Sequence, residues 1–203
     1  MISRKNRIYL IVFIFSLFLL SPIIAEETSP RNTVEILLNS ISTIKTEKPL
    51  SLEEIQENNV LSTRALARLD MVEISRKALG KYWEKRTSAE QKVFTDLLSL
   101  MFIKEAFPNS GKFFSSFKLI YGQTITNKSQ ATVPLKVIHE KEGEIYIDFH
   151  LYKNAVQWQV IDVDLDKISM RNNLRSQFYK VISTKNYQEL VRRMEKKLAS
   201  TNG

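Results

Sequence analysis

The sequence predicts an α+β fold in which a curved antiparallel sheet of four strands packs against several helices. Apolar residues recur at helical spacing through most of residues 33–102. After Gly111 the spacing changes to the alternation that is typical of strands, and the turn formers Gly143 and Asn154 separate neighbouring strand segments. These observations indicate helices that cover one side of an antiparallel meander.

Four helices are expected before the sheet, because each has a recognisable start. Their expected starts are Thr33, Ser51, Asp70 and Thr87, and stop signals follow at Pro49, Gly80 and Pro108. Ser51 with Glu54 and Thr87 with Glu90 form capping boxes, in which a hydroxyl and a carboxylate satisfy free backbone N–H groups. The helix from Thr87 has the widest apolar face of the four.

The expected strands are residues 113–121, 131–137, 145–151 and 158–165. The third segment alternates most cleanly, and Pro134 predicts an edge position for the second, because proline cannot donate to a strand ladder. Two helices are expected after the sheet, one through Phe178 and one with an apolar stripe from Tyr187 to Leu198.

The first residues have the pattern of an export signal. Three cations precede an apolar run over residues 8–20, and the small residue Ala25 follows shortly before Glu26. The run is shorter than the roughly 20 residues that span a bilayer. We therefore expect residues 1–25 to be a cleaved signal peptide and residues 26–203 to be one domain, with an uncleaved N-terminal anchor as the alternative.

Composition excludes several kinds of site. The chain has no cysteine, so a disulfide framework, a thiolate site and lipid attachment through an N-terminal cysteine are all excluded. Its two histidines, His139 and His150, have no second His or carboxylate at ligand spacing. We expect neither a metal site nor a cofactor.

The charge balance permits an anionic partner but does not favour nucleic acid. Removal of residues 1–25 takes away three cations and no anion, so the net charge falls from +8 to (30 − 3) − 22 = +5. Arg192, Arg193, Lys196 and Lys197 form a cationic helix face without interleaved aromatic residues to stack on bases. A solvated face is the simplest interpretation, and attraction to anionic headgroups or an acidic partner is the second.

Enzyme chemistry has only weak support in the sequence. Asp162, Asp164 and Asp166 alternate along one expected strand, and Asp148 and His150 share a strand face. No Ser, His and Asp arrangement, phosphate-binding glycine loop or metal motif is present. The carboxylates are better interpreted as a solvated strand end, and the chain is not expected to be an enzyme.

A specific resemblance lies in the last expected strand and the helix after it. The residues that carry it are Trp158, Val160, Asp162, Val163, Leu165, Ser169, Asn173, Arg175, Gln177 and Phe178. In this order and spacing they resemble the Mla-type periplasmic phospholipid-binding proteins, also called toluene-tolerance auxiliary proteins of an ABC transport system. A weaker similarity runs from Asp70 to Phe94. Lys167 and Leu174 depart from the family pattern, which has glycine and tyrosine there.

The resemblance implies a periplasmic carrier that binds a glycerophospholipid by its acyl chains. Its implied partners are an inner-membrane ABC transporter complex with an MCE-type substrate-binding subunit and an outer-membrane lipoprotein complex. The implied role is the maintenance of outer-membrane lipid asymmetry, with phospholipid as cargo. The alternative is a small α+β enzyme, or another domain that binds an apolar ligand, on a cone-shaped sheet.

A carrier of this kind needs a dry apolar cavity between the sheet and the helices. The candidate lipid-binding residues on the strands are Val133, Leu135, Val137, Ile145, Ile147, Phe149 and Leu151. Alternation alone does not distinguish a lined cavity from a filled core. The resemblance favours the cavity.

The family signature implies a structural role for Trp158, Asp162, Arg175, Gln177 and Phe178. We expect Arg175 to pair with Asp162, whose strand ends just before the helix begins, or with a neighbouring backbone carbonyl. Such a pair would fix the angle between strand and helix. A direct contact with a lipid headgroup is the competing role, because a guanidinium suits phosphate.

Overall fold

A computed structural model describes residues 29–139 and 143–200 of the chain. The expected signal peptide and its cleavage site lie outside the described residues. No described helix combines the length and the apolar character that crossing a membrane requires. The fold class is α+β, as the sequence predicts.

The N-terminal helices follow the predicted signals closely. They are α2 (Pro30–Ser42), α3 (Leu52–Leu66), α4 (Met71–Leu79) and the short η1 (Gly80–Tyr82). Ser51 and Glu54 form the predicted capping box of α3, and Asp70 caps α4. The cap of α2 is Ser29, however, and Thr33 lies buried one turn inside that helix.

A long helical segment extends further than the sequence suggests. It consists of α5 (Ser88–Met101), the π-helical η2 (Phe102–Ala106) and α6 (Phe107–Ser115). The predicted stop at Pro108 is wrong, because this proline lies in the first turn of α6, where its missing N–H is tolerated. The strand expected over residues 113–121 consequently begins only at Lys118.

Within the described residues the sheet has six strands, of which two are very short. They are β1 (Lys118–Tyr121), β2 (Ile125–Asn127), β3 (Gln130–His139), β4 (Gly143–Lys153), β5 (Trp158–Leu165) and β6 (Ile168–Ser169). The order is β1-β3-β4-β5-β6, with β2 also paired to β3, and every pair of named strands is antiparallel. Four of these strands correspond to the four that were expected, and the added ones have two and three residues.

The edge position predicted from Pro134 is wrong, since β3 lies inside the sheet. The carbonyl oxygen of Pro134 accepts a hydrogen bond of 2.8 Å from the N–H of Gly122, just after β1 has ended. The N–H and C=O of a strand residue point to the same side. An N–H at position 134 would therefore point to the gap between β1 and β2. Its absence in proline costs no hydrogen bond with β4.

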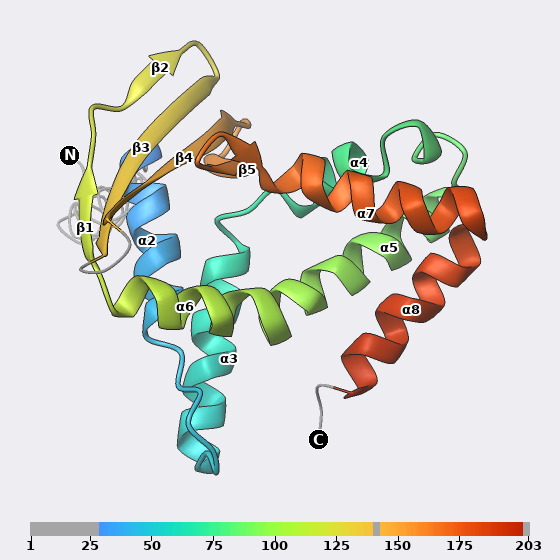
Figure 1. Cartoon of the computed structure of the whole chain (residues 1–203), viewed down its shortest axis with the longest axis horizontal. Helices are drawn as coiled ribbons and strands as arrows, with labels where there is room; N and C mark the ends of the chain where they lie inside the picture. The colour runs from blue at the N-terminus through green and yellow to red at the C-terminus, as the bar shows by residue number, and fades with distance from the viewer. Residues whose placement is uncertain (1–28, 140–142, 201–203) are drawn as a thin grey trace, which may run out of the picture.

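The helices enclose one face of the sheet and extend beyond it (Figure 1). Helix α2 packs against β3, β5 and α6, while α7 (Met170–Thr184) packs against α4 and β5. The C-terminal helix α8 (Tyr187–Ser200) packs against α5 and α7, and Tyr187 donates a hydrogen bond of 3.0 Å to the carbonyl oxygen of Glu90. Figure 1 shows α6 running below the sheet, opposite β5.

Candidate functional site: an apolar cavity between sheet and helices

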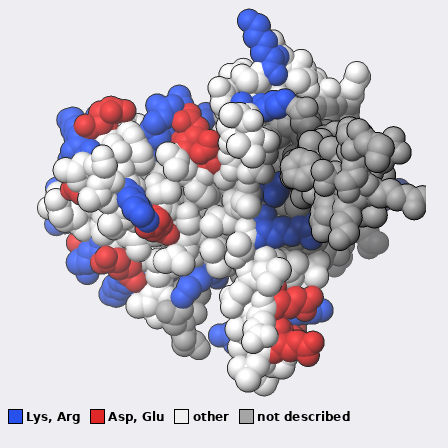
Figure 2. All heavy atoms as spheres, turned by 180° about the vertical axis from the view of Figure 1, so that it is seen from behind, with Lys and Arg blue, Asp and Glu red and all other residues white. Residues whose placement is uncertain are grey.

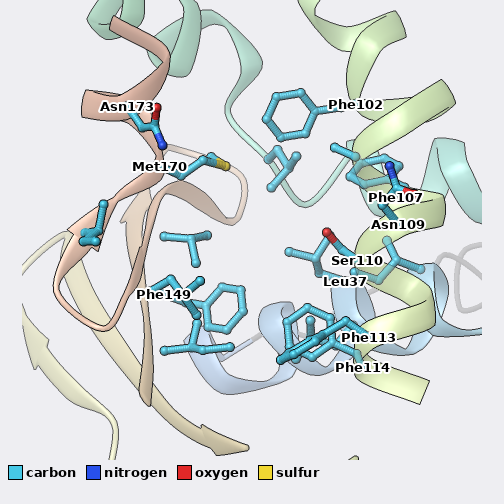
Figure 3. A pocket seen from close by; sticks show the side chains of 18 residues that line it. Leu37, Phe102, Phe107, Asn109, Ser110, Phe113, Phe114, Phe149, Met170 and Asn173 are labelled. Atoms are coloured by element: carbon cyan, nitrogen blue, oxygen red, sulfur yellow. The ribbon is translucent and has the colours of Figure 1, made fainter. Parts of the chain in front are cut away.

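A cavity of about 640 Å³ lies between the inner face of the sheet and α6. Leu37, Leu38 and Ile41 of α2 form its inner wall, and Ile147, Phe149 and Val163 contribute the sheet wall. Figure 3 shows the side chains pointing from these elements into a common space. Among the described residues, the lining is almost entirely apolar and includes no Lys, Arg, Asp, Glu or His. The described part of the site therefore contains no titrating side chain.

Aromatic side chains of η2 and α6 form the wall opposite the sheet. Phe102 and Phe107 meet edge to face with ring centroids 5.9 Å apart, and Phe113 and Phe114 do the same at 5.2 Å. All four rings line the cavity. Edge-to-face contacts of this kind are a preferred arrangement of aromatic rings, so the four rings also pack favourably in pairs with one another.

Gly111 sets how closely α6 approaches α2. A Cβ atom at this position would meet the carbonyl oxygen of Ile41 and would lie 2.9 Å from its carbonyl carbon. The backbones of the two helices thus touch at a point where only glycine fits. Ile41 of α2 and Ser110 of α6, the residue before Gly111, both line the cavity next to this contact.

The mouth of the cavity combines exposed apolar residues with a few uncharged polar ones. Leu165 is 50% exposed and Ile168 is 66% exposed, and both line the cavity beside the turn that joins β5 to β6. The polar lining residues are Asn109 and Ser110 of α6 and Asn173 of α7. The deep end, by contrast, is closed by buried residues such as Leu38 and Phe149.

The structure divides the seven predicted lipid-binding residues into two groups. Ile147 and Phe149 line the cavity. Five do not: Val133, Leu135, Val137 and Leu151 are buried in the core, and Ile145 is half-buried against it. These five side chains pack in or against the core, and Ile147 and Phe149 are the two of the seven beside the cavity. Lipid contact stays a prediction for all seven.

Sequence reasoning missed the helical half of the lining. Leu37, Leu38 and Ile41 have helical spacing, which predicted a helix covering the sheet but not an open space beneath it. The sequence predicts that Phe113 and Phe114 belong to a strand, whereas they lie in α6. Their aromatic character beside Phe107 was the available signal.

The signature residues organise the joint between β5 and α7. Asp162 is 4% exposed and accepts hydrogen bonds from the hydroxyl of Ser169 at 2.7 Å and from the backbone N–H of Arg171 at 3.0 Å. The guanidinium of Arg171 approaches the same carboxylate at 3.3 Å. Asp162 therefore ties the end of the strand to the first turn of the helix.

The turn between β5 and β6 keeps a left-handed backbone without the family's usual glycine. Asp166 has φ of +47° and Lys167 has φ of +69°. Such conformations are strained for residues that carry a Cβ. The carboxylate of Asp166 accepts a hydrogen bond of 3.1 Å from the N–H of Tyr146, which holds the turn against β4.

Of the two partners predicted for Arg175, the structure shows a backbone carbonyl and not Asp162. The Nε of Arg175 donates a hydrogen bond of 2.8 Å to the carbonyl oxygen of Lys77, near the C-terminal end of α4. Arg175 does contact a backbone carbonyl, but one of α4, and it does not line the cavity. Its contact joins α7 to α4, whereas Arg171 is the cation beside Asp162.

Two other signature residues are core residues. Trp158 is buried at the start of β5, and Phe178 is buried on α7, where its ring meets that of Phe94 edge to face at 5.5 Å. The side chain of Gln177 donates a hydrogen bond of 2.9 Å to Oδ1 of Asn173, one turn earlier on α7. Gln177 thus orients a residue of the cavity mouth.

The groups considered for catalysis lie away from the cavity. The Nε2 of His150 is 3.0 Å from Oδ2 of Asp164, and its Nδ1 is 3.3 Å from the hydroxyl of Thr132. Because neighbouring residues alternate faces, and Phe149 and Val163 face the cavity, His150 and Asp164 lie on the outer face of the sheet. Among the described residues, no group of three or more His, Asp or Glu residues could hold a metal ion.

Charges on the surface are mixed in sign. Figure 2 shows basic and acidic side chains interspersed over the face turned away from the view of Figure 1. On α8, Glu189 pairs with Arg192 at 2.7 Å and with Arg193 at 2.8 Å, and Lys197 lies 3.2 Å from Glu105. The cationic face predicted for this helix is therefore partly neutralised.

Comparison with known proteins places this architecture in a family. No curated protein matches the sequence. A solved structure of a phospholipid-binding protein from Ralstonia solanacearum, in complex with a phospholipid, has the same fold, with a TM-score of 0.70 at 19% identity. The match covers 87% of this chain and 100% of that one. The family described as MlaC protein matches residues 33–196. With most of its length matched, the chain belongs to the MlaC protein family.

Proposed function

We propose that the mature chain is a periplasmic carrier that binds a glycerophospholipid by its acyl chains. It exchanges this cargo with an inner-membrane ABC transporter complex, through an MCE-type subunit, and with an outer-membrane lipoprotein complex. The apolar cavity of about 640 Å³ carries the proposal. Family membership and a structural relative that was solved with phospholipid support it.

The size of the cavity suits acyl chains. A methylene group fills roughly the volume of one liquid water molecule, about 30 Å³. On this basis the cavity of about 640 Å³ holds roughly 20 methylene groups. Each methylene group kept out of water contributes ~0.8 kcal/mol. Burial of roughly 20 such groups therefore offsets about 16 kcal/mol of the cost of taking a lipid out of a bilayer.

A binding role fits the lining better than a catalytic one. The described residues around the cavity provide no carboxylate, imidazole, ammonium or thiol that could act as acid, base or nucleophile. The pairing of His150 with Asp164 lies on the other face of the sheet. We therefore assign no reaction to the chain, and ATP hydrolysis belongs to the transporter.

Native and denaturing mass spectrometry of the protein purified from periplasm tests the proposal. We expect a polypeptide that begins at Glu26, and a native mass that exceeds it by one or more phospholipids. Extraction with organic solvent should release the same lipids. A folded protein that carries no lipid, and takes none from phospholipid vesicles, would overturn the carrier function.

A further inference from the structure

Two uncharged polar groups face the cavity from opposite walls of its mouth. Asn173 lies on α7 and Ser110 lies on α6, and both belong to the lining. Figure 3 shows the amide nitrogen of Asn173 on the cavity side and the hydroxyl of Ser110 pointing inward. Apart from Asn109, the other lining residues are apolar, so these two groups are candidates for contact with the polar part of the cargo.

The orientation of Asn173 is fixed by a neighbour. Its Oδ1 accepts a hydrogen bond of 2.9 Å from Gln177, which turns its NH₂ group toward the cavity. Within the part of the chain that the structure describes, neither the Asn173 NH₂ group nor the Ser110 hydroxyl has a hydrogen-bond partner. Both groups are thus available as donors to a ligand.

Their depth in the cavity indicates which part of a lipid they would meet. The fully buried end, with Leu38 and Phe149, suits the methyl ends of acyl chains. The exposed rim at Ile168 borders solvent. Asn173 is exposed and Ser110 is half-buried, so both lie nearer to solvent than the buried end does. The acyl esters and the glycerol of a lipid would sit there if its chains enter first.

We propose that Asn173 and Ser110 donate hydrogen bonds to the acyl-ester carbonyl oxygens of the bound lipid, and this rests on the carrier function proposed above. An ester carbonyl that leaves water without a new partner weakens binding. A neutral amide and a hydroxyl suit this uncharged acceptor. A phosphate group would favour Lys or Arg, and the lining contains neither in the part of the chain that the structure describes. Gln177 acts as a positioning residue for Asn173.

A competition assay with delipidated mature protein tests this contact. Three probes of equal chain length displace a fluorescent lipid: a diacyl phosphatidylcholine, its dialkyl ether analogue, and a diacylglycerol. The ether analogue lacks ester carbonyls, and the diacylglycerol lacks phosphate. We expect the protein to bind both diacyl probes at least about threefold more tightly than the ether analogue, because one net hydrogen bond contributes roughly two- to tenfold in affinity and two contribute more.

Ser110→Ala and Asn173→Asp should bring the ratio of diester to diether affinity toward one. Asn173→Asp keeps the size of the side chain but replaces its donor, and an acid in the first turns of α7 does not oppose the helix. Gln177→Ala should lower the ratio less, because Asn173 keeps its donor. The matched controls are Ser115→Ala on α6 and Asn172→Asp on α7, both exposed and outside the lining, and they should keep the wild-type ratio.

Equal affinity of the wild type for the diester and the diether would overturn the proposal. It would also be overturned if neither Ser110→Ala nor Asn173→Asp changed the ratio of diester to diether affinity. Binding that requires phosphate but not esters would assign the two donors to the headgroup and would also refute it. If no probe displaces the fluorescent lipid, the carrier function itself fails. Circular dichroism and melting temperature show whether each variant is folded.

Discussion

Neighbouring residues of β4 on one face of the sheet have different surroundings. Ile147 and Phe149 face the cavity, whereas Leu151, two positions further, is enclosed by the core. All three are almost completely shielded from solvent, at 3%, 2% and 1% exposed. Burial alone therefore does not distinguish residues that line the cavity from residues that fill the core.

Substitutions at these positions should separate lipid binding from stability. Ile147→Asp places a carboxylate in the apolar cavity, where an unpaired charge is strongly disfavoured, so bound lipid should be lost. Leu151→Ala opens a small void in the core and should cost about 2–5 kcal/mol of unfolding free energy, while lipid is kept. Lipid per protein is measured by mass spectrometry, and stability by urea unfolding.

Met170→Asp, at a half-buried lining position, repeats the test should Ile147→Asp fail to fold. A folded Ile147→Asp or Met170→Asp protein with a full complement of phospholipid would show that the cavity is not the binding site. Loss of lipid from a folded Leu151→Ala protein would mean that the division between core and cavity is wrong.

The sequence could predict the inward face of β4 but not what lies opposite it. Alternation shows that Ile147 and Phe149 point toward the helices. Whether they meet a packed side chain or an open space depends on how far α6 stands from the sheet. That distance is a tertiary property, and the spacing of apolar residues along one strand does not encode it.

At the scale of elements, the segment between Phe102 and Phe117 departs most from the prediction. Pro108 and Gly111 resemble stop signals, and the phenylalanines after them favour strands. In the structure the π-helical η2 carries the helix through this region, and the N–H of Phe107 donates to the carbonyl of Phe102 five residues earlier. Packing of the phenylalanine rings around the cavity outweighs their local preference for strand.

The same segment explains the role of Gly111, which sequence reasoning treated only as a boundary. Gly111→Ala should force α2 and α6 apart, because the new Cβ would meet the backbone of Ile41 and backbone cannot rotate away. We expect a loss of about 1–3 kcal/mol of unfolding free energy, as for other overpacked sites. Urea unfolding of delipidated protein measures it without a contribution from ligand binding.

Gly122→Ala is the matched control for this substitution. Its Cβ would lie 3.1 Å from the Cβ of Pro134, in an exposed loop after β1, which is a tight contact with a side chain and not a clash with backbone. Equal stability of the Gly111→Ala and Gly122→Ala proteins would show that the approach of α6 to α2 tolerates a methyl group. Gly111 would then have no special role in shaping the cavity.

At the scale of the whole molecule, ionisation should limit stability on the acid side. Hydrogen bonds from Arg192 and Arg193 lower the pKa of Glu189 to about 2, and backbone hydrogen bonds in the capping boxes lower the pKa of Glu54 and Glu90. Their usual pKa is 4.5. A lowered pKa gives stability that is present above pH 4.5 and is lost as the carboxylates are protonated below it.

Tyr121 should limit stability on the alkaline side. Burial at the edge of the sheet, with the charge of Glu35 nearby, raises its pKa to about 12 from 10.0. The folded protein therefore holds this proton more tightly than the unfolded chain does. The resulting stabilisation is complete below pH 10 and is lost as the pH rises from 10 to about 12.

Tyr121→Phe tests this alkaline limit, since phenylalanine keeps the ring but has no proton to lose. The ring of Tyr121 packs under the guanidinium of Arg31, 4.8 Å from its centroid, and that contact remains possible in the variant. We expect the melting temperatures of the variant and wild type to run parallel between pH 7 and 9. Above pH 10 the melting temperature of the wild type should fall more steeply than that of the variant.

Tyr152→Phe, at an exposed position of β4, serves as control and should follow the wild type. If wild type and Tyr121→Phe lose stability in parallel up to pH 12, ionisation of Tyr121 does not set the alkaline limit.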